Sequence, residues 1–545
     1  MDQPREGRVM GRATRKLLLR LITGACLLLL CDQLGAQVVL DKYVSSEAGD
    51  SLRSVANAGD VDGDGTPDII VGQTGAGVGG RALVLSGATG EVLHTLEGGI
   101  PGGGFGWSVG GAGDMNGDGL ADLIVGAPGG AGYARAYSGA DGSQLYHWTL
   151  LSVTDFGKCV TGVGDWNLDG FDDVVVTAAT AVQPGVAIVF SGKTGTVLAN
   201  LGPPAASPPI RGFGISCDCS ADIDNDGRPD LILGSYSSNF ARVVKGGTPT
   251  PLLDITSGIS GSYFGVSVAG LGDLDGDGHD DVAVGDPYAF SPNAAGYAAF
   301  FSGVDGSPIF VLVGEGNSER FGADMASVGD VDLDGTPDIA VSAYYATNPP
   351  GGTNGPGTVR VFSGADGSLL CSVGGVAAGD AFGFALDPGG DMDGDGRPEL
   401  LVAASSEDAP GKASVGAAYV ISITEERWTD LGQATAAAGT TPELQGSGLA
   451  LPSDPLTLQL SEATPSVPGL LFVGLAYVGW PFFTGELVPR PDVTIGLATD
   501  ATGTWTLLAA WPPGIPSGVP IYIQAWVGTP LQSPAASNAL ALLTP

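Results

Sequence analysis

The chain has 545 residues, enough for more than one domain with a buried core. Glycine is abundant, with 91 residues, and only 15% of the residues are charged, which excludes a disordered acidic polymer and favours a β-rich fold with many turns. The formal net charge of −37 disfavours nucleic acid as a partner, because phosphate binding needs a basic surface, and it favours cations.

The first 36 residues differ in composition from the rest of the chain. Six basic residues precede the apolar run LITGACLLLL (21–30), and the small residue Ala36 ends the segment. A basic start, a short apolar run and a small final residue are typical of a secretory signal peptide, and the run is too short to span a bilayer. We therefore expect residues 1–36 to be a signal peptide and the protein to be secreted or held at the cell surface, without a transmembrane segment.

Four cysteines follow this segment: Cys159, Cys217, Cys219 and Cys371. An exported protein permits disulfides, but four cysteines in so long a chain do not form a disulfide framework. We expect small buried residues or a single pair, and the spacing does not say which cysteines would pair.

An acidic nonapeptide recurs seven times, at intervals of 51 to 61 residues. Phe-Gly stands nine residues before six of the seven copies, and in the first copy that slot holds Ser51-Leu52. We call the nonapeptides acidic loops 1 to 7, and they span residues 60–68, 114–122, 165–173, 222–230, 273–281, 330–338 and 391–399.

Each repeat continues in the same way after its acidic loop. A short apolar run follows, then a second run that ends in Ser-Gly in five repeats, then a turn and one more short run. Four short strands joined by glycine-rich turns form a meander, and seven such units predict a β-propeller. The predicted fold class is all-β, a seven-bladed β-propeller followed by a small β-sandwich-like domain.

The two ends of the repeat region predict how the ring closes. The run at residues 37–45 stands where a fourth strand would precede the first blade, and the seventh repeat loses the pattern after its third strand. We expect residues 37–45 to complete blade 7, residues 37–427 to form the propeller and residues 428–545 to form a C-terminal β-rich domain.

The composition of the acidic loops predicts a calcium site in each. Positions 1, 3 and 5 are Asp or Asn, position 6 is Gly, position 9 is acidic, and position 7 varies, as expected if it offers only its carbonyl oxygen. Oxygen ligands without Cys or a required His favour Ca²⁺ over Zn²⁺ or copper. The predicted ligands for up to seven ions are Asp60, Asp62, Asp64, Thr66, Asp68, Asp114, Asn116, Asp118, Leu120, Asp122, Asp165, Asn167, Asp169, Phe171, Asp173, Asp222, Asp224, Asp226, Arg228, Asp230, Asp273, Asp275, Asp277, His279, Asp281, Asp330, Asp332, Asp334, Thr336, Asp338, Asp391, Asp393, Asp395, Arg397 and Glu399.

Two other interpretations of the loops are weaker. A solvated acidic turn explains one copy but not seven in register, and an EF-hand carries its last ligand at position 12 between helices. The sites need not be equal. Asn116 and Asn167 remove one charge each from loops 2 and 3, which predicts weaker binding there, and Glu399 in loop 7 has a longer arm than aspartate.

The stretch FGWSVGGAGDMNGDGLADLIVGAP (105–128) strongly resembles the FG-GAP repeat of integrin α-subunit propellers and of related bacterial exported proteins. The resemblance covers about residues 37–427 and implies a seven-bladed propeller with Ca²⁺ loops between the first and second strands of blades. Integrin α-chains usually load only some blades, whereas all seven copies here keep the acidic pattern. Nothing in the chain resembles the inserted domain or the β-subunit that supplies the integrin adhesion site, so adhesion is an analogy from the fold.

The face opposite the acidic loops is the expected ligand face, because its loops between second and third strands vary in length. The candidates for protein or glycan contact are Tyr236, Tyr288, Phe290, Tyr344 and Tyr345. The alternative is that these rings pack over the blade edges.

The sequence contains no catalytic constellation. Only three histidines occur, and GxSxG, HExxH and P-loop motifs are absent. We expect a non-enzymatic, exported, calcium-binding propeller that acts as a binding or adhesion module, with calcium in a structural role. The alternative is a lectin-like carbohydrate-binding protein or a calcium-dependent polysaccharide-active enzyme.

Overall fold

The computed structural model describes most of the predicted propeller and the strands of the C-terminal region. Within these residues, no helix has the length and apolar character needed to cross a membrane. The described residues are 37–45, 49–150, 152–180, 182–205, 210–257, 263–289, 295–316, 318–332, 334–347, 354–394, 396–409, 411–423, 428–430, 443–447, 455–461, 468–474, 477–482, 485–489, 493–500, 504–510, 520–527 and 535–543. The predicted signal peptide lies outside them.

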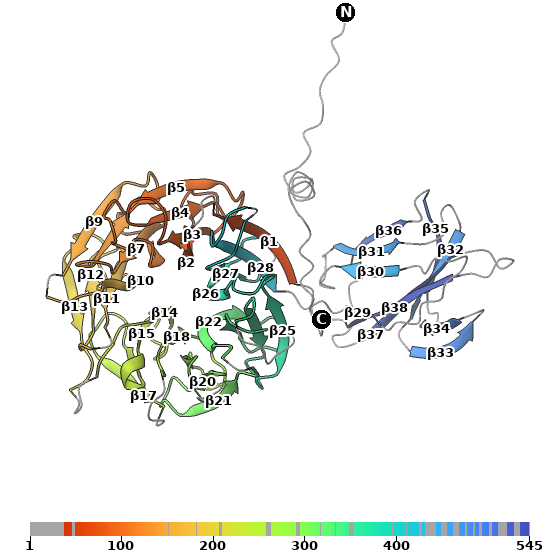
Figure 1. The fold of residues 1–545 in the computed structure, drawn as a ribbon. Helices are drawn as coiled ribbons and strands as arrows, with labels where there is room; N and C mark the ends of the chain where they lie inside the picture. The colour runs from red at the N-terminus through yellow and green to blue at the C-terminus, as the bar shows by residue number, and fades with distance from the viewer. Residues whose placement is uncertain are drawn as a thin grey trace, which may run out of the picture. The chain divides into compact units, whose positions relative to one another are not determined.

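Seven four-stranded antiparallel sheets form a ring, which confirms the predicted seven-bladed propeller (Figure 1). Blade 1 comprises β2 (Leu52–Gly59), β3 (Asp68–Gln73), β4 (Arg81–Leu85) and β5 (Val92–Glu97). Blade 2 comprises β6 (Ser108–Gly113), β7 (Asp122–Ala127), β8 (Tyr133–Tyr137) and β9 (Gln144–Thr149). Blade 3 comprises β10 (Phe156–Gly164), β11 (Asp173–Ala178), β12 (Val186–Phe190) and β13 (Val197–Leu201). Blade 4 comprises β14 (Cys217–Ala221), β15 (Asp230–Ser235), the 3-10 turn η1 (Tyr236–Ser238), β16 (Phe240–Val244) and β17 (Pro251–Thr256).

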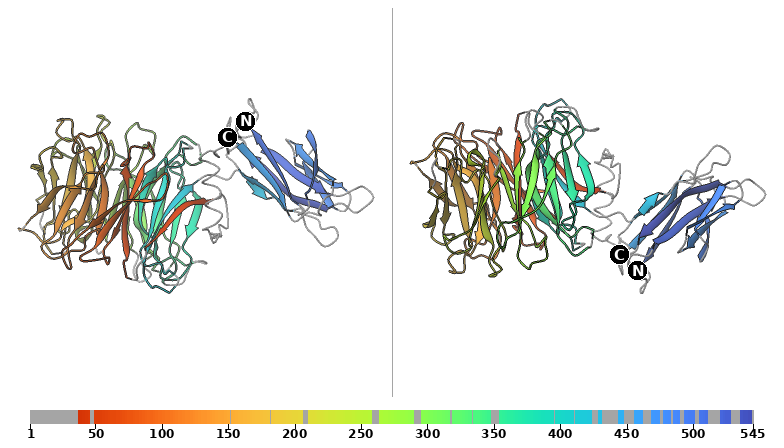
Figure 2. Two further views of the ribbon diagram at one scale, coloured as in Figure 1. Left: turned by 90° about the horizontal axis from the view of Figure 1, so that it is seen from above. Right: turned by 90° about the horizontal axis from the view of Figure 1, so that it is seen from below.

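The remaining blades repeat this order. Blade 5 comprises β18 (Ser267–Gly270), β19 (Val282–Asp286), β20 (Tyr297–Phe301) and β21 (Pro308–Val313). Blade 6 comprises β22 (Phe321–Gly329), β23 (Asp338–Ala343), β24 (Thr358–Phe362) and β25 (Leu369–Gly374). Blade 7 comprises β26 (Phe382–Gly390), β27 (Glu399–Ala404), β28 (Ala417–Ile423) and β1 (Gln37–Val44). Views from above and below show that the strands run between two faces, where the loops gather (Figure 2).

The burial of each strand follows its place in the blade. Second strands such as β7, with the sequence DLIVGA, are buried at every position, because neighbouring blades cover both of their faces. Outer strands such as β9 are exposed or partly exposed at five of six positions. The first strands line a central channel of about 710 Å³.

The first strand of the chain supplies the outer strand of the last blade. β1 pairs antiparallel with β28, from Gln37 opposite Ile423 to Val44 opposite Ala417. The ammonium group of Lys42 also forms an ion pair with a carboxylate of blade 7. Backbone pairing and an ion pair thus join the two ends of the repeat region.

The phenylalanine of each Phe-Gly pair wedges between neighbouring blades. Phe105 is fully buried in a cluster with Ile70 and Val84 of blade 1. Gly106 has φ +84°, and a Cβ there would lie 2.6 Å from the carbonyl oxygen of Arg81, so only glycine fits. In blade 1, Leu52 occupies the buried position that phenylalanine occupies in the other blades. Leu52 lies one residue closer to its acidic loop than these phenylalanines do, because the first strand of blade 1 has one residue fewer before the loop.

The C-terminal strands form three sheets. A five-stranded sheet has the order β29-β38-β37-β32-β35, a three-stranded sheet the order β30-β31-β36, and β33 pairs with β34. The bounds are β29 (Trp428–Asp430), β30 (Glu443–Ser447), β31 (Pro455–Ser461), β32 (Pro468–Gly474), β33 (Tyr477–Phe482), β34 (Gly485–Pro489), β35 (Val493–Ala498), β36 (Trp505–Ala510), β37 (Pro520–Val527) and β38 (Ala535–Leu543). The β-rich character agrees with expectation, and the β-sandwich stays a prediction.

Candidate metal loops and channel mouth

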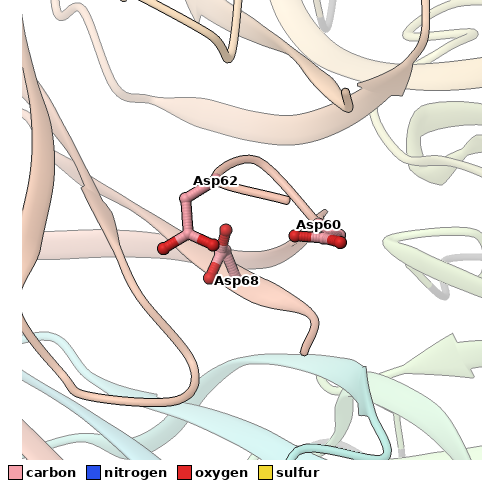
Figure 3. Close-up of side chains that lie close together, drawn as sticks. All are labelled: Asp60, Asp62 and Asp68. Atoms are coloured by element: carbon pink, nitrogen blue, oxygen red, sulfur yellow. The ribbon is translucent and has the colours of Figure 1, made fainter. Parts of the chain in front are cut away.

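Each acidic loop connects the first strand of a blade to the second. In loop 1, Asp60, Asp62 and Asp68 offer carboxylate oxygens within 4.8 Å of one another (Figure 3). Loops 4 to 7 bring the acids at positions 1, 3 and 9 equally close: Asp222, Asp224 and Asp230; Asp273, Asp275 and Asp281; Asp330, Asp332 and Asp338; Asp391, Asp393 and Glu399. Asp395 lies outside the described residues.

The acid at position 1 determines the shape of the loop. Asp60 Oδ1 accepts a hydrogen bond from Gly63 N at 2.8 Å, and its Oδ2 accepts one from Gly65 N at 2.9 Å. Gly65, at position 6, has φ +88°, a conformation that a residue with Cβ adopts only with strain. Each carboxylate oxygen keeps a further lone pair for a cation, because an oxygen of this type can accept more than one partner.

The acid at position 9 joins the loop to the end of the third strand. Asp122 is fully buried, and it accepts hydrogen bonds from Met115 N at 2.9 Å and from Gly139 N at 3.0 Å. A Cβ on Gly139 would lie 1.9 Å from the carbonyl oxygen of Ala121, so glycine is required. Sequence reasoning missed this role of Ser-Gly, although its recurrence was a visible signal. The equivalent donors in blades 1 to 6 are Gly87, Gly139, Gly192, Gly246, Gly303 and Gly364.

The electrostatics of the loops favour a bound cation. Burial, together with the nearby charges of Asp118 and Asp114, raises the pKa of Asp122 to about 6. The same directions hold for Asp68, where Asp62 is the nearby charge. A divalent cation would remove this repulsion, and an all-oxygen donor set is the kind that Ca²⁺ prefers. The residues present therefore fit Ca²⁺, and the individual ligand assignments stay predictions.

Loops 2 and 3 differ from the others at position 3. The amide nitrogen of Asn116 donates to Asp122 Oδ1 at 3.1 Å and to the hydroxyl of Ser138 at 3.2 Å. The amide nitrogen of Asn167 donates to Asp169 Oδ2 at 3.2 Å. By donating to Asp122 and Asp169, these amides partly offset the negative charge of the loops. Weaker calcium binding in loops 2 and 3 stays a prediction.

The residues at positions 7 and 8 link neighbouring loops. Phe171 of loop 3 lies against Gly117 of loop 2, where an added Cβ would be 2.7 Å from its ring. Asp172 accepts a hydrogen bond from Asp114 N at 2.8 Å. The variable side chains at position 7 therefore pack on the preceding loop, which the sequence pattern did not indicate.

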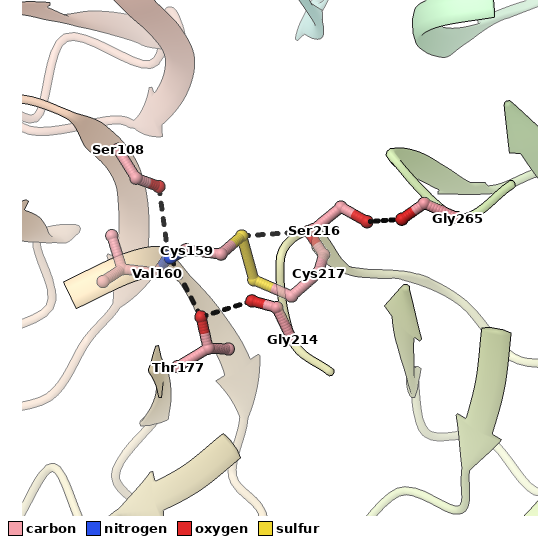
Figure 4. Close-up of a disulfide and its surroundings, with 8 residues drawn as sticks. All are labelled: Ser108, Cys159, Val160, Thr177, Gly214, Ser216, Cys217 and Gly265. Atoms are coloured by element: carbon pink, nitrogen blue, oxygen red, sulfur yellow. Dashed lines mark hydrogen bonds between the residues drawn. A yellow bond between two sulfur atoms is a disulfide. The ribbon is translucent and has the colours of Figure 1, made fainter. Parts of the chain in front are cut away.

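A row of side chains in the channel wall connects successive blades. The residue six positions before the acidic loop reaches the next blade: Ser54 Oγ donates to Gly106 O at 3.0 Å, and Ser267 Oγ donates to Gly322 O at 2.8 Å. In blade 3 this place holds Cys159, which forms a disulfide with Cys217 of blade 4, with a Cα–Cα distance of 6.1 Å (Figure 4). The cysteine pairing that the sequence left open is thus a disulfide that links two adjacent blades.

The carboxylates of Asp218, Asp324 and Asp387 are among the groups that line the same channel. Asp324 accepts hydrogen bonds from Met325 N and from Leu386 N of blade 7, and Asp387 accepts one from Asn57 N of blade 1. Burial, together with the charge of Asp218, raises the pKa of Asp324 to about 7. Burial also raises the pKa of Asp387. These acids thus support the contacts between blades but are disfavoured in their charged form.

Two cations and two aromatic rings surround the end of the channel opposite the acidic loops. The guanidinium of Arg53 lies 3.4 Å from the ring centroid of Trp107 and 5.2 Å from that of Phe384. The ammonium of Lys158 lies 4.1 Å from the Trp107 ring centroid. Burial lowers the pKa of Arg53 to about 10. Within the described residues, neither cation takes part in an ion pair. We call these four residues the mouth group.

A row of tyrosines continues from the mouth group along the same face. Ring centroids lie 6.0 Å apart for Tyr236 and Tyr263, 4.8 Å for Tyr263 and Tyr288, and 4.6 Å for Tyr344 and Tyr345. Four of the five predicted contact residues therefore lie together, partly buried, and Phe290 lies outside the described residues. Sequence reasoning missed Tyr263, which is 44% exposed, because it precedes Phe-Gly instead of following a second strand.

The tyrosine row joins the mouth group through direct contacts. Tyr344 lies 5.4 Å from Phe384 between ring centroids, and the neighbouring Tyr288 adds to the effect of burial in raising the pKa of Tyr344. The guanidinium of Arg320 lies 4.0 Å from the ring centroid of Tyr288. The contacts extend from Tyr236 in blade 4 through blades 5, 6, 7, 1 and 2 to Lys158 in blade 3, so every blade contributes.

The three histidines lie apart from one another. His94 and His147 lie on the outer strands β5 and β9, and His279 contacts the carbonyl oxygen of Ile223 at 2.9 Å in loop 5. They form no common site with the mouth group.

Comparison with protein-family models identifies the repeats. The FG-GAP repeat matches residues 105–146, 321–362 and 382–421, and the FG-GAP-like repeat matches residues 60–125 and 222–284. These matches confirm the FG-GAP resemblance in blades 1, 2, 4, 5, 6 and 7.

Curated relatives include several integrin α-chains. Integrin alpha-5 of Xenopus laevis is 29% identical over 208 residues, which is 34% of this chain and 19% of the relative. Human integrin alpha-IIb is 38% identical over 159 residues, or 26% of this chain and 15% of the relative. Integrin alpha pat-2 of Caenorhabditis elegans is 27% identical over 241 residues, or 38% and 19%. The matched region thus makes up less than a fifth of each of these relatives.

Proposed function

Since the chain carries FG-GAP repeats in a propeller that resembles that of integrin α-chains, we propose that it is an exported interaction module. Calcium in the acidic loops stabilises the ring, and the ligand binds over the opposite face, at the mouth group and the tyrosine row. We place the function in binding, because the groups gathered on that face are aromatic rings and two cations that lie over them, an arrangement suited to contact with a ligand.

The observation that carries this proposal is the continuity of the mouth group with the tyrosine row. Aromatic rings offer large contact areas at low cost in side-chain entropy, and they are enriched where proteins bind partners. Seven blades contribute to one set of contacts around a channel of about 710 Å³. A ligand seated there would contact several blades at once.

The charge of the mouth group favours an acidic group in the ligand. Arg53 and Lys158 are cations in a chain of net charge −37, and they contact rings instead of carboxylates. A carboxylate or sulfate on a protein or glycan ligand would pair with both cations in a partly desolvated place, where such a pair is stronger than in water. The ligand is therefore a protein or glycan with an exposed acidic group.

A binding experiment tests this proposal. The purified chain, with calcium present, is applied to an array of neutral, carboxylated and sulfated glycans and of acidic and neutral peptides. We expect binding to acidic members, and a loss of at least tenfold in affinity in the double variant Arg53→Met and Lys158→Met. Tyr263→Ala should weaken binding by a smaller factor, because that tyrosine is farther along the row.

The matched control is Tyr146→Ala, since Tyr146 is a partly buried tyrosine stacked on Trp148 at 5.3 Å on the outer strand of blade 2. This variant should bind like the wild type. Equal binding by the wild type and the Arg53/Lys158 double variant would contradict the proposed surface. Cleavage of an array glycan would support the polysaccharide-active alternative, and selective glycan binding without cleavage would support the lectin-like one.

A further inference from the structure

The dipeptide that follows the third strand of each blade is different in blade 4. Ser-Gly stands there in blades 1, 2, 3, 5 and 6, whereas blade 4 has Lys245-Gly246. The backbone contact is unchanged, because Gly246 N donates to Asp230 Oδ1 at 2.6 Å, as Gly303 N donates to Asp281 Oδ1 at 2.9 Å in blade 5. The difference is therefore one side chain, a lysine in place of a serine.

The side chain at this place faces the acidic loop of its own blade. In blade 5, the hydroxyl of Ser302 donates to Asp277 Oδ2, at position 5 of the loop, over 3.1 Å. In blade 2, the hydroxyl of Ser138 accepts a hydrogen bond from Asn116, at position 3, over 3.2 Å. A serine here thus reaches the side chains at positions 3 and 5 without adding charge.

In blade 4 the lysine brings a cation to these same two positions. The ammonium of Lys245 pairs with Asp224, at position 3, and with Asp226 Oδ2, at position 5, over 2.5 Å. All three side chains are about one-third exposed or less. A lysine ammonium is charged at neutral pH, so the two carboxylates hold a permanent cation.

The carboxylate oxygens of Asp224 and Asp226 cannot bind Ca²⁺ and pair with the ammonium of Lys245 at the same time. Ca²⁺ requires oxygen ligands at about 2.3–2.6 Å, and its charge repels an ammonium held by those ligands. Loop 4 otherwise keeps the pattern of loop 5, since both bring the acids at positions 1, 3 and 9 within 4.8 Å of one another. The composition of loop 4 alone therefore predicts a calcium site there.

We infer that the ammonium of Lys245 takes the place of Ca²⁺ in loop 4, so that the ring holds six calcium ions and one internal cation. This inference rests on the proposed calcium binding of the other loops. Blade 4 is then independent of calcium, while its neighbours need the ion to offset their acids.

The calcium content of reciprocal variants tests the inference. The full chain is dialysed against buffer with saturating Ca²⁺, and bound calcium is measured by atomic emission. We expect six ions in the wild type, seven in Lys245→Ser and five in Ser302→Lys. The combined variant should return to six, with the unoccupied loop moved from blade 4 to blade 5.

The matched control is Lys193→Ser, two residues beyond the equivalent place in blade 3, which is Ser191. Lys193 lies over the ring of Phe171 at 4.4 Å and forms no ion pair with the acids of its loop among the described residues, so this variant should keep six ions. If Lys245→Ser does not fold, Lys245→Met removes the charge with the apolar stem kept, and it should also bind seven.

Two outcomes overturn the inference in different ways. Seven ions in both the wild type and Lys245→Ser would show that the lysine does not exclude calcium, while the proposed calcium loops would stand. No bound calcium in any variant would overturn the calcium loops themselves, and with them this inference.

Discussion

The two ends of the propeller channel differ in what the repeats keep constant. At the end with the acidic loops, the blades repeat the same atoms: an aspartate at position 1 that accepts loop amides, and a buried acid at position 9 that accepts an amide beside the third strand. At the other end, each blade offers a different side chain at one equivalent place, two residues after the first position of Phe-Gly. These residues are Arg53, Trp107, Lys158, Ile215, Val266, Ala323 and Phe384.

This difference separates the part of the repeat that builds the ring from the part that is free to vary. At the loop end, the glycines of Ser-Gly have no room for a Cβ and the glycines at position 6 have positive φ, so these positions permit almost no substitution. The residues at the mouth contact one another through side chains, so they can change without altering the sheets. We therefore expect stability to depend on the loop end and ligand binding on the mouth.

The largest effect on stability should follow removal of calcium. EGTA should lower the melting temperature by more than about 10 °C, because each occupied site contributes about 2.7 kcal/mol at one hundred times its Kd. Differential scanning calorimetry measures the shift, and added Ca²⁺ should restore the original value. An unmoved transition would contradict calcium in the loops.

A smaller effect on stability should follow removal of the disulfide between blades 3 and 4. The Cys159→Ser and Cys217→Ser double variant opens a link that spans 58 residues, and it should lower the free energy of unfolding by about 2–4 kcal/mol. Urea unfolding in saturating calcium measures this change. Cys219→Ser changes a free cysteine in the same strand and serves as the control, with a smaller expected loss.

The channel acids should make stability depend on pH. The pKa of Asp324 is about 7 in the folded chain and about 3.9 when unfolded, so its contribution is full below pH 4 and is lost as the pH rises to 7. Asp324→Asn should stabilise the protein at pH 8 by on the order of 2 kcal/mol, after allowance for channel water, and should lose this advantage near pH 4.

Thermal unfolding from pH 4 to pH 8 in saturating calcium measures the effect of Asp324→Asn. The exposed acid Glu91 provides the control, since Glu91→Gln should follow the wild type at every pH. A constant difference between Asp324→Asn and the wild type across this range would show that Asp324 is ionised throughout.

The smallest effect on stability should come from the mouth. Arg53→Met keeps the apolar stem over Trp107 and removes a partly desolvated charge, so the free energy of unfolding should change by less than about 1 kcal/mol. Urea unfolding measures it beside the binding assay. A loss as large as that of the disulfide variant would place the mouth group in the structural part of the ring.

Much of the site followed from the sequence because the relevant signals are local. The acids of a loop lie within nine residues of one another, and position 6 must be glycine for the turn, so spacing alone predicted clusters such as Asp60, Asp62 and Asp68. Contacts between blades could not be predicted in this way. The Cys159–Cys217 pair joins two blades, and only the packed ring brings its two residues together. Lys245 and Asp224 are 21 residues apart within blade 4, and the pairing of the strands in that blade brings them together.

The sequence by itself determined the number of blades, the position of the acidic loops and their oxygen donor set, because these depend on a repeated local pattern. Tertiary structure decided that the residues after Phe-Gly meet at one mouth, that the tyrosines join them, and that Lys245 lies between Asp224 and Asp226. The physical reason is that a closed ring of seven blades brings equivalent positions of different repeats to one axis. The ligand that the channel mouth can bind therefore depends on the one residue that each repeat contributes to it.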